Sequence, residues 1–209
     1  MSHDGITWVE EYPGFSEGYC IAFARGLSAP ELLDRMGCDV RASVMLTPAE
    51  AAQRMLDSDG FMLGSKHGII RAGESQGWGF AIEEFSGQAL DADVLAAVSE
   101  GTVALAFFSN GSLRAFSYAE AGRHLWIWEP GYVVDPDHIP TQLVPPLTAV
   151  GLTAADGQVV EYPVAEPEFQ ALLALSMASR QFGVALTPQD VAGSLLAAPR
   201  RADDRGGGQ

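Results

Sequence analysis

The sequence has few cysteines and no long apolar run. Cys20 and Cys38 are the only cysteines among 209 residues, and each is expected to fill space as a small buried apolar side chain rather than to react. No apolar run approaches the ~20 residues that a membrane-spanning helix needs. No basic stretch followed by an apolar core marks a signal peptide. We therefore expect a cytoplasmic protein without disulfide bonds or membrane spans.

Positive charge is also scarce. The chain has 12 lysine and arginine residues against 27 aspartate and glutamate residues, and Lys66 is the only lysine. The formal net charge is −15 and the pI is near 4.4. A surface of this sign repels nucleic acid and anionic membranes, so neither is expected as a partner. The charge suits either solubility alone or binding to a basic partner protein.

Three motifs that often carry chemistry are present only in incomplete form. Residues 14–18 match G-x-S-x-G, but no strand precedes Ser16, as a nucleophile elbow requires. The glycine-rich run 60–66 breaks the spacing of a phosphate-binding loop, because His67 stands where Ser or Thr should follow the lysine. Residues 135–138 offer two carboxylates and an imidazole, but no second cluster at ligand spacing completes a metal site. No cofactor and no metal is therefore expected.

The histidines do not supply a catalytic pair by their spacing. They are scattered along the chain, at His3, His67, His124 and His138. Neither a Ser/His nor a Cys/His arrangement can be argued from these positions. The sequence therefore predicts no catalytic residue.

The apolar content predicts one folded domain. Hydrophobic residues make up 47% of the chain, which is ample for a core at this length. We predict a single α+β domain over residues 1–198 and a disordered tail over residues 199–209, which is charged and then glycine-rich. The expected architecture is a mostly antiparallel sheet of five to seven strands, with helices packed against it and a C-terminal helical pair.

A three-stranded meander over residues 102–129 is predicted to form the centre of this sheet. Asn110-Gly111 favours a two-residue turn with positive φ, and residues 120–122 allow a turn of two or four residues. Both faces of the meander are apolar, so other elements should cover both. Its three strands are rich in β-branched and aromatic residues: Thr102–Ser109, Ser112–Tyr118 and Arg123–Glu129.

The two-residue turn sets an expected pairing of the meander strands. The turn at Asn110-Gly111 places Phe107 opposite Arg114. If the second turn also has two residues, Arg114 lies opposite Glu129 in a cross-strand ion pair. Glu120 and Arg123 form a second expected pair.

Alternation along the three strands divides the meander side chains between two faces. One face is predicted to carry Val103, Leu105, Phe107, Arg114, Phe116, Tyr118, Leu125 and Ile127. The other is predicted to carry Ala104, Ala106, Phe108, Leu113, Ala115, Ser117, Trp126 and Trp128.

Capping and turn signals predict the remaining elements. The further strands are expected at Tyr19–Arg25, Phe61–Leu63, Gly68–Arg71 and Trp78–Glu84. The helices are expected to begin after capping boxes at Ser28 and Thr47, at Asp91, at Glu166 and after Thr187. They are expected to end near Met36, Leu56, Val98, Phe182 and Ala197.

Several runs resemble a family of small acidic actinobacterial proteins that is known only as a domain of unknown function. The runs are residues 18–23 with 25–27, residues 78–83, residues 116–123 and Glu129-Pro130. The resemblance extends from about Tyr19 to Leu196. The family often has Asp-Gly where Ala121-Gly122 stands, a difference that concerns only a turn. The resemblance implies a recurring domain and supplies no catalytic or binding residues.

Two hypotheses of function follow. The first is a non-enzymatic protein-binding domain, for instance an immunity or accessory protein that masks a basic partner, and it rests on the acidic charge and the lack of a catalytic constellation. The second is a small-molecule-binding domain or an enzyme, because ligand pockets combine aromatic walls with a few polar groups. The same residues could instead be core and cross-strand pairs. The candidates for a pocket lining are Trp78, Glu83, Arg114, Trp126 and Trp128.

Overall fold

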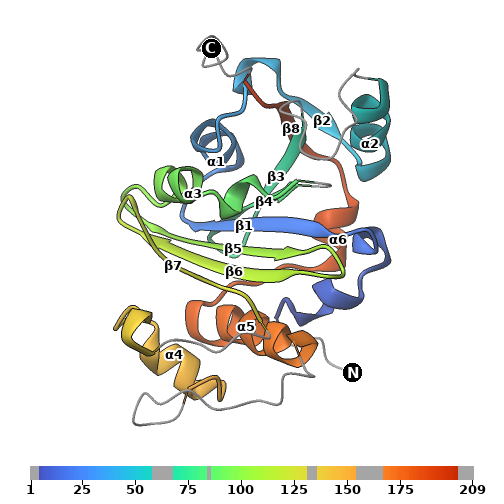
Figure 1. Ribbon diagram of the computed structural model, residues 1–209. Coiled ribbons are helices and arrows are strands. Elements are labelled where there is room, and N and C mark those ends of the chain that lie inside the picture. Colours follow the sequence, from blue (N-terminus) through green and yellow to red (C-terminus); the bar gives the residue numbers. More distant parts are fainter. Residues whose placement is uncertain (1–4, 58–67, 84–85, 131–135, 154–166, 202–209) are drawn as a thin grey trace, which may run out of the picture.

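The computed structural model describes residues 5–57, 68–83, 86–130, 136–153 and 167–201. Its strands are β1 (Tyr19–Arg25), β2 (Val44–Leu46), β3 (Ile69–Ser75), β4 (Trp78–Glu83), β5 (Val103–Ser109), β6 (Arg114–Glu120), β7 (Arg123–Trp128) and β8 (Leu195–Pro199). They form one antiparallel sheet of eight strands in the order β2-β8-β3-β4-β1-β5-β6-β7 (Figure 1). The predicted α+β class is confirmed, and the sheet has more strands than the five to seven expected.

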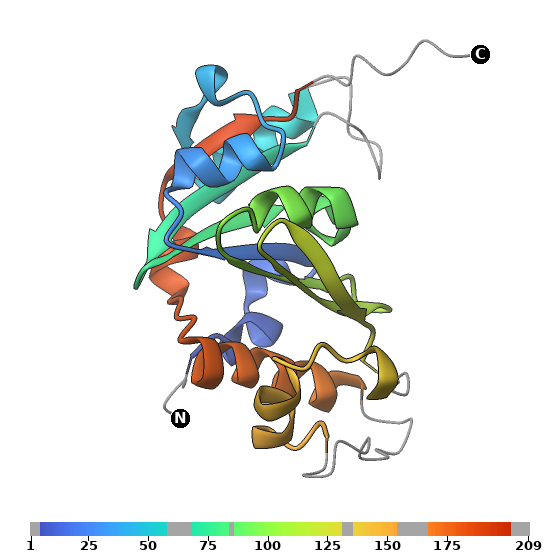
Figure 2. The same ribbon diagram turned by 90° about the vertical axis from the view of Figure 1, so that its left-hand side faces the viewer.

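Helices cover both faces of the sheet. The α-helices are α1 (Ala29–Arg35), α2 (Pro48–Asp57), α3 (Ala92–Val98), α4 (Val144–Ala149), α5 (Pro167–Phe182) and α6 (Pro188–Ala192). The 3-10 helices are η1 (Thr7–Glu11), η2 (Pro13–Phe15), η3 (Val40–Ala42), η4 (Gln88–Leu90) and η5 (Pro136–His138). Figure 2 shows α1 and α3 on one side of the sheet and α4 and α5 on the other.

The two faces differ in the size of their side chains. Along β1, Ile21 and Phe23 join a large aromatic core that includes residues of η1, α4 and α5. Cys20, Ala22 and Ala24 join an alanine-rich core beneath α1 and α3. Because small side chains allow a helix to approach a sheet closely, the alternation along one strand positions helices on both faces.

The predicted capping boxes begin three of the helices. In α1 the backbone N–H of Ser28 donates to the Glu31 carboxylate at 3.0 Å. The same reciprocal arrangement joins Thr47 to Glu50 before α2, and Thr187 to Asp190 before α6. These side chains satisfy N–H groups that have no intrahelical partner, so helix starts are encoded locally.

The loop between β5 and β6 is longer than predicted. It has four residues, because Ser109 pairs with Arg114. The Asn110 side-chain oxygen accepts hydrogen bonds from the N–H groups of Ser112 at 3.2 Å and Leu113 at 2.8 Å, which closes the wider loop. The predicted two-residue turn is therefore wrong, and the pairing moves by two residues.

The shifted pairing changes the partners of the meander strands. Phe107 lies opposite Phe116, with ring centroids 5.0 Å apart, and not opposite Arg114. The expected Arg114–Glu129 pair is also wrong, whereas the pairing of Glu120 with Arg123 is confirmed. That second turn consists of two residues only, Ala121 and Gly122, with φ of 52° and 77°.

A bulge between β6 and β7 overturns the predicted division of faces. Tyr118 pairs with Trp126 and Ala119 pairs with His124, so Leu125 is an extra residue on β7. One extra residue moves every following side chain to the opposite face. Trp126 and Trp128 therefore join the large core on the side of Phe116 and Tyr118, and Ile127 is exposed.

The meander forms one end of the sheet and not its centre. β7 is an edge strand, and β4 and β1 occupy the middle of the strand order. β8 inserts between β2 and β3, and these strands lengthen the sheet on the side away from the meander. Sequence periodicity cannot report such an insertion, because it depends on contacts far along the chain.

The C-terminal segment also departs from expectation. The predicted helix after Thr187 ends at Ala192, and the apolar run that follows is β8 instead of a continued helix. The predicted tail begins at Pro199, yet Pro199 is the last residue of β8 and Arg200 forms a bridge with Cys38. The predicted strand Phe61–Leu63 lies outside the described residues, as does the glycine-rich run 60–66.

Candidate functional site

Two of the predicted lining residues lie in the core. Trp126 and Trp128 stack with ring centroids 6.0 Å apart and an interplanar angle of 8°. Their exposed fractions are 7% and 5%. Phe116 packs edge-on against Trp126 at 5.9 Å between centroids. The two rings therefore bury large apolar area between the sheet and the helices of that face.

Trp78 lies on the same face but is separated from the other tryptophans. β4 and β7 have three strands between them, so four strand spacings, or roughly 19 Å, separate their axes. The Trp78 ring is buried beneath the Arg25 guanidinium, whose carbon lies 5.0 Å from the ring centroid. Arg25 also donates to the Phe182 carbonyl at 3.5 Å. The three tryptophans thus do not form one common wall.

Glu83 lies on the opposite face of the sheet. It is fully buried, and its carboxylate accepts hydrogen bonds from the Ser86 hydroxyl at 2.6 Å and from the N–H groups of Gln88 and Ala89 at 2.9 Å. It lies opposite Cys20, whose thiol pKa is raised first by burial and then by the Glu83 charge. Glu83 therefore holds the segment that leads into η4.

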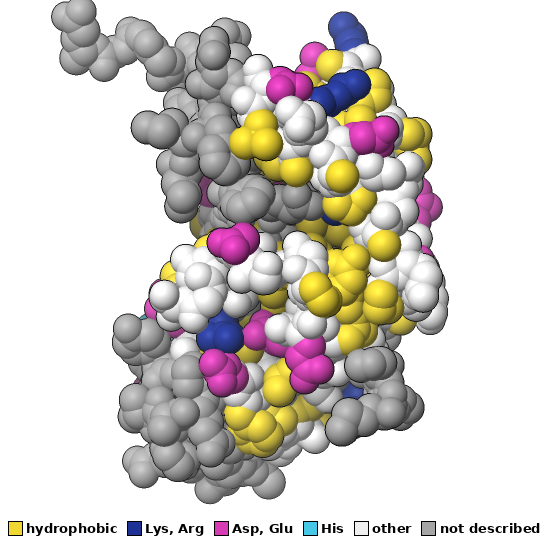
Figure 3. Space-filling model, turned by 90° about the vertical axis from the view of Figure 1, so that its right-hand side faces the viewer, with side chains coloured by type: hydrophobic (Ala, Val, Ile, Leu, Met, Phe, Trp, Pro, Cys, Tyr) yellow, Lys and Arg dark blue, Asp and Glu magenta, His cyan; other side chains and the backbone are white. Residues whose placement is uncertain are grey.

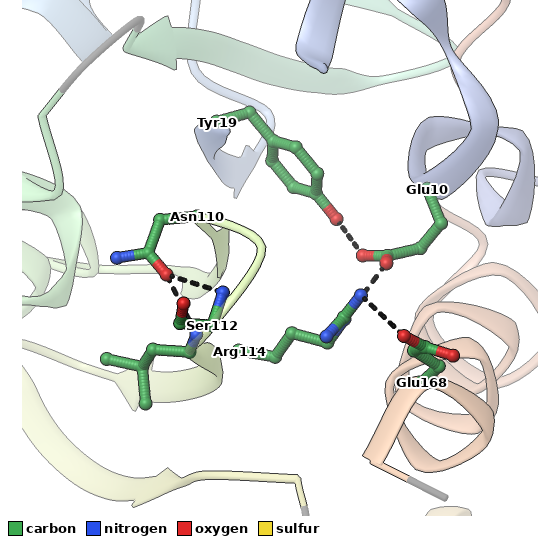
Figure 4. Close-up of polar contacts among 7 residues, drawn as sticks. Glu10, Tyr19, Asn110, Ser112, Arg114 and Glu168 are labelled. Atoms are coloured by element: carbon green, nitrogen blue, oxygen red, sulfur yellow. Dashed lines mark hydrogen bonds and ion pairs between the residues drawn. The ribbon is translucent and has the colours of Figure 1, made fainter. Parts of the chain in front are cut away.

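Arg114 is the centre of a polar cluster, which we call the Arg114 network: Glu10, Tyr19, Arg114 and Glu168 (Figure 4). Arg114 Nε donates to Glu10 Oε2 at 3.1 Å, and Arg114 Nη2 lies 3.6 Å from Glu168 Oε1. The Tyr19 hydroxyl donates to Glu10 Oε1 at 2.5 Å. The network joins η1, β1, β6 and α5, which meet at the end of the sheet where β6 begins.

Most of this network is shielded from water. The side chains of Arg114 and Glu10 are 14% and 12% exposed, whereas that of Glu168 is 77% exposed. Burial, followed by the Glu10 carboxylate, raises the Tyr19 pKa well above its ordinary value, so the phenol remains a hydrogen-bond donor at neutral pH. With two carboxylates and one guanidinium, the network retains a net negative charge.

Two exposed carboxylates are close in sequence to Glu10 and Tyr19. Glu11 ends η1 and Glu17 follows η2, and both are exposed. We call the surface of Glu10, Glu11, Glu17 and Glu168 the acidic face. Figure 3 shows Asp and Glu side chains gathered near the middle of one side of the molecule, beside apolar side chains.

Negative charge predominates across the described surface. Its exposed carboxylates belong to Glu11, Glu17, Glu31, Asp34, Glu50, Asp57, Glu74, Asp91, Asp93, Glu100, Glu129, Asp137 and Glu168. Its exposed arginines are Arg25, Arg41, Arg54, Arg123, Arg180 and Arg201.

The structure also forms a Ser/His pair that spacing did not predict. Ser117 Oγ lies 2.8 Å from His124 Nε2 and 3.3 Å from the Trp126 carbonyl oxygen. Burial lowers the pKa of His124, and the Asp91 carboxylate partly offsets this effect. Ser117 is fully buried, so a substrate cannot reach its hydroxyl in this arrangement.

The spacing of Ser117 and His124 in the β6–β7 hairpin could have indicated this pair. With a two-residue turn at Ala121-Gly122, Ser117 and His124 are diagonal neighbours on one face of adjacent strands. The turn length was left open from the sequence, and the contact was therefore not identified.

The described residues supply no evident metal centre. Within those ranges, no three His, Cys, Asp or Glu side chains come together as metal ligands. Of the predicted cluster at 135–138, Asp137 and His138 belong to η5, and Asp135 lies outside the described ranges. None of the helices in the described part of the chain has the length and apolar character needed to span a membrane.

Comparison with known proteins places the chain in a family without assigning it an activity. The profile of one protein family, described as a family of unknown function (DUF6461), matches residues 2–196. None of the curated proteins matches the chain, and none of the solved structures matches it.

Proposed function

We propose that the protein, which belongs to this family of unknown function, is a non-enzymatic binding domain that engages a basic partner protein through its acidic face. The observation that carries the proposal is the surplus of carboxylates around the Arg114 network. Glu10 and Glu168 already neutralise the guanidinium of Arg114. Any further cation that approaches this face therefore meets negative charge that no arginine of the network offsets.

The exposed carboxylates of the face are available to a partner. Among the described residues, no ion pair joins Glu11 or Glu17 to a cation. Both flank the apolar side chains of η1 and η2, where Phe15 packs against Tyr12 and Tyr19. Charged groups beside a rigid aromatic cluster suit protein recognition. The charges steer the encounter with a partner, and the packed rings keep the surface in one conformation.

The positions of the other candidate residues favour this hypothesis over a small-molecule-binding domain or an enzyme. Trp126 and Trp128 contribute to the core, and Glu83 lies on the opposite face of the sheet. The Ser117 hydroxyl, beside His124, is fully buried. An immunity or accessory protein that masks a basic partner needs no catalytic constellation and fits these observations.

The salt dependence of association tests the proposal. A tagged protein is used to recover partners from its native cell at low and high salt, and the association rate of each recovered protein is then measured. Association should slow markedly between about 50 mM and about 500 mM salt, because the Debye length contracts from about 14 Å to about 4 Å. Dissociation should change much less, since it depends on close contacts.

A matched pair of variants locates the effect. Glu11→Gln/Glu17→Gln removes two charges from the acidic face and should slow association. Asp93→Asn/Glu100→Gln removes the same charge from α3 and the turn after it, which lie on the other face of the sheet, and should leave the rate nearly unchanged. Equal slowing by both variants would contradict a localised site. Recovery of no protein, together with a small molecule retained in native mass spectrometry, would favour the ligand-binding alternative instead.

A further inference from the structure

The two edges of the sheet are protected to different degrees. β7 carries the bulge at Leu125, and the exposed charges of Arg123 and Glu129 flank it. Bulges and charges are the usual devices that prevent an edge strand from pairing with another chain. β2 pairs with β8 on one side, and on its other side no strand of the described ranges pairs with it. Within the described ranges, β2 itself carries neither a bulge nor a charged side chain, and it is only three residues long.

Apolar side chains gather at this less protected edge. Met45 is 58% exposed and Val44 is 36% exposed, both on β2. Leu56, on the neighbouring helix α2, is 57% exposed. These three make up half of the large apolar side chains that are exposed in the described ranges, the others being Leu113, Ile127 and Phe169. By alternation Val44 shares the α2 side of β2 with Leu46, which packs on Ala51, and Met45 lies on the other side, so this edge offers apolar side chains to a partner on both faces.

The charges near β2 favour a second copy of this chain as the partner. Among the described residues, the elements around β2 carry the cations of Arg41, Arg54, Arg200 and Arg201. The same surroundings contain the carboxylates of Asp34, Asp39, Glu50 and Asp57. The two signs balance in number among these described residues, although the whole chain carries −15. Two copies of this chain repel each other, and this end is where the repulsion is weakest.

We propose that the β2 edge and α2 form the interface of a homodimer, in which β2 pairs antiparallel with β2 of a second copy about a twofold axis at Met45. An antiparallel edge is self-complementary, as a twofold interface requires. The axis stands perpendicular to the sheet, so α2 of both copies lies on the same side. The two helices then run antiparallel.

The charges of α2 suit this arrangement. Glu50 lies in its first turn and Arg54 in its last, and both are exposed. Antiparallel helices place Glu50 beside Arg54 of the partner subunit, and the twofold axis repeats the pair. The dimer is independent of the proposed function, because the acidic face belongs to η1, η2 and α5 and not to β2.

Sedimentation equilibrium with one substitution at each edge tests the proposal. The native chain should sediment at twice its 22.2 kDa mass. Met45→Lys places like charges opposite each other across the axis and should raise the dimer dissociation constant at least about tenfold. Ile127→Lys makes the same change on the β7 edge and should leave the constant unchanged. A native chain that sediments as a monomer at its highest soluble concentration, or equal weakening by both substitutions, would overturn the dimer.

Cross-linking supplies a second test that does not require the folded chain to accept a lysine at position 45. Residues directly opposite in an antiparallel pair have Cβ atoms about 5 Å apart, close to the reach of a disulfide. Met45→Cys should therefore form a covalent dimer on oxidation, and Ile127→Cys should not. The native Cys20 and Cys38 do not compete, because both are fully buried. A Met45→Cys chain that stays monomeric on oxidation would also overturn the proposal.

Discussion

Arg114 binds Glu10, 104 residues earlier in the chain, through a hydrogen bond of 3.1 Å between Nε and Oε2. The contact fixes η1 against the start of β6. Tyr19 binds the other oxygen of the same carboxylate. Glu10 is thus held from two strands at once, and it connects the N-terminal segment to the sheet.

Loss of the Glu10 charge should destabilise the protein more than loss of the Glu168 charge. Glu10→Gln leaves the mostly buried guanidinium of Arg114 without its closest anion, which should cost about 2 kcal/mol in the free energy of unfolding. Glu168→Gln removes an anion that is 77% exposed and should cost less than about 0.5 kcal/mol. Urea denaturation of both variants measures the difference. Similar midpoints would show that the network does not hold η1 to the sheet.

Replacement of Gly111 by a β-branched residue should destabilise the protein. Its φ is +80°, a conformation that β-branched residues disfavour, and this holds whether the loop has two residues or four. Gly111→Val should therefore cost more than about 1 kcal/mol. Ser112→Val, at the exposed neighbouring position, provides the control and should change stability by less than about 0.5 kcal/mol. Coincident denaturation midpoints for the two variants would mean that this loop is wrongly described.

Two truncations should separate the end of β8 from the residues beyond it. Deletion of residues 199–209 removes the backbone hydrogen bonds that Pro199, Arg200 and Arg201 make with Asp39, Gly68 and Gly37. At about 1 kcal/mol each, their loss should lower the melting temperature by roughly 5–10 °C. Deletion of residues 202–209 should leave it unchanged, because a run with three consecutive glycines offers little apolar area to bury. A large effect of the shorter deletion would refute that expectation.

The stability of the protein should depend on the protonation of His124. Burial lowers its pKa in the folded state, so the unfolded state binds a proton first as the pH falls. The contribution of His124 to the free energy of unfolding is fully present above its ordinary pKa of about 6.5. It is lost as the pH falls through the lowered pKa of the folded state. Denaturation of the native chain and of His124→Gln between about pH 7.5 and about pH 5 measures it. The native chain should lose stability relative to the variant.

Asp91 offers a test of the cause of that shift. Its carboxylate raises the pKa of His124, and it also caps α3 by accepting from the N–H groups of Asp93 and Val94. Asp91→Ser keeps a capping oxygen and removes the charge. The NMR titration of His124 should then move to lower pH. An unchanged titration would show that Asp91 does not act on this imidazole.

The elements with local sequence signals could be predicted from the amino-acid sequence alone. The capping boxes at Ser28, Thr47 and Thr187 place helix starts, because their hydrogen bonds span only three residues. Apolar runs place the strands of the meander, since side-chain alternation is a property of a few consecutive residues. Within the candidate site, the sequence alone identified Arg114 but none of the residues that bind it.

Features that depend on contacts between distant residues follow only from the three-dimensional structure. The meander lies at one end of the sheet because β1 pairs with β5 and no strand of the described ranges pairs with the outer side of β7, although no property of the meander itself requires this order. One extra residue at Leu125 brings both β7 tryptophans to the large core, and a rule of strict alternation cannot anticipate it. Glu10 and Glu168 meet Arg114 only after η1 and α5 have packed against the sheet. Local signals cannot encode such pairs, because their free energy exists only once the chain has closed the intervening loops.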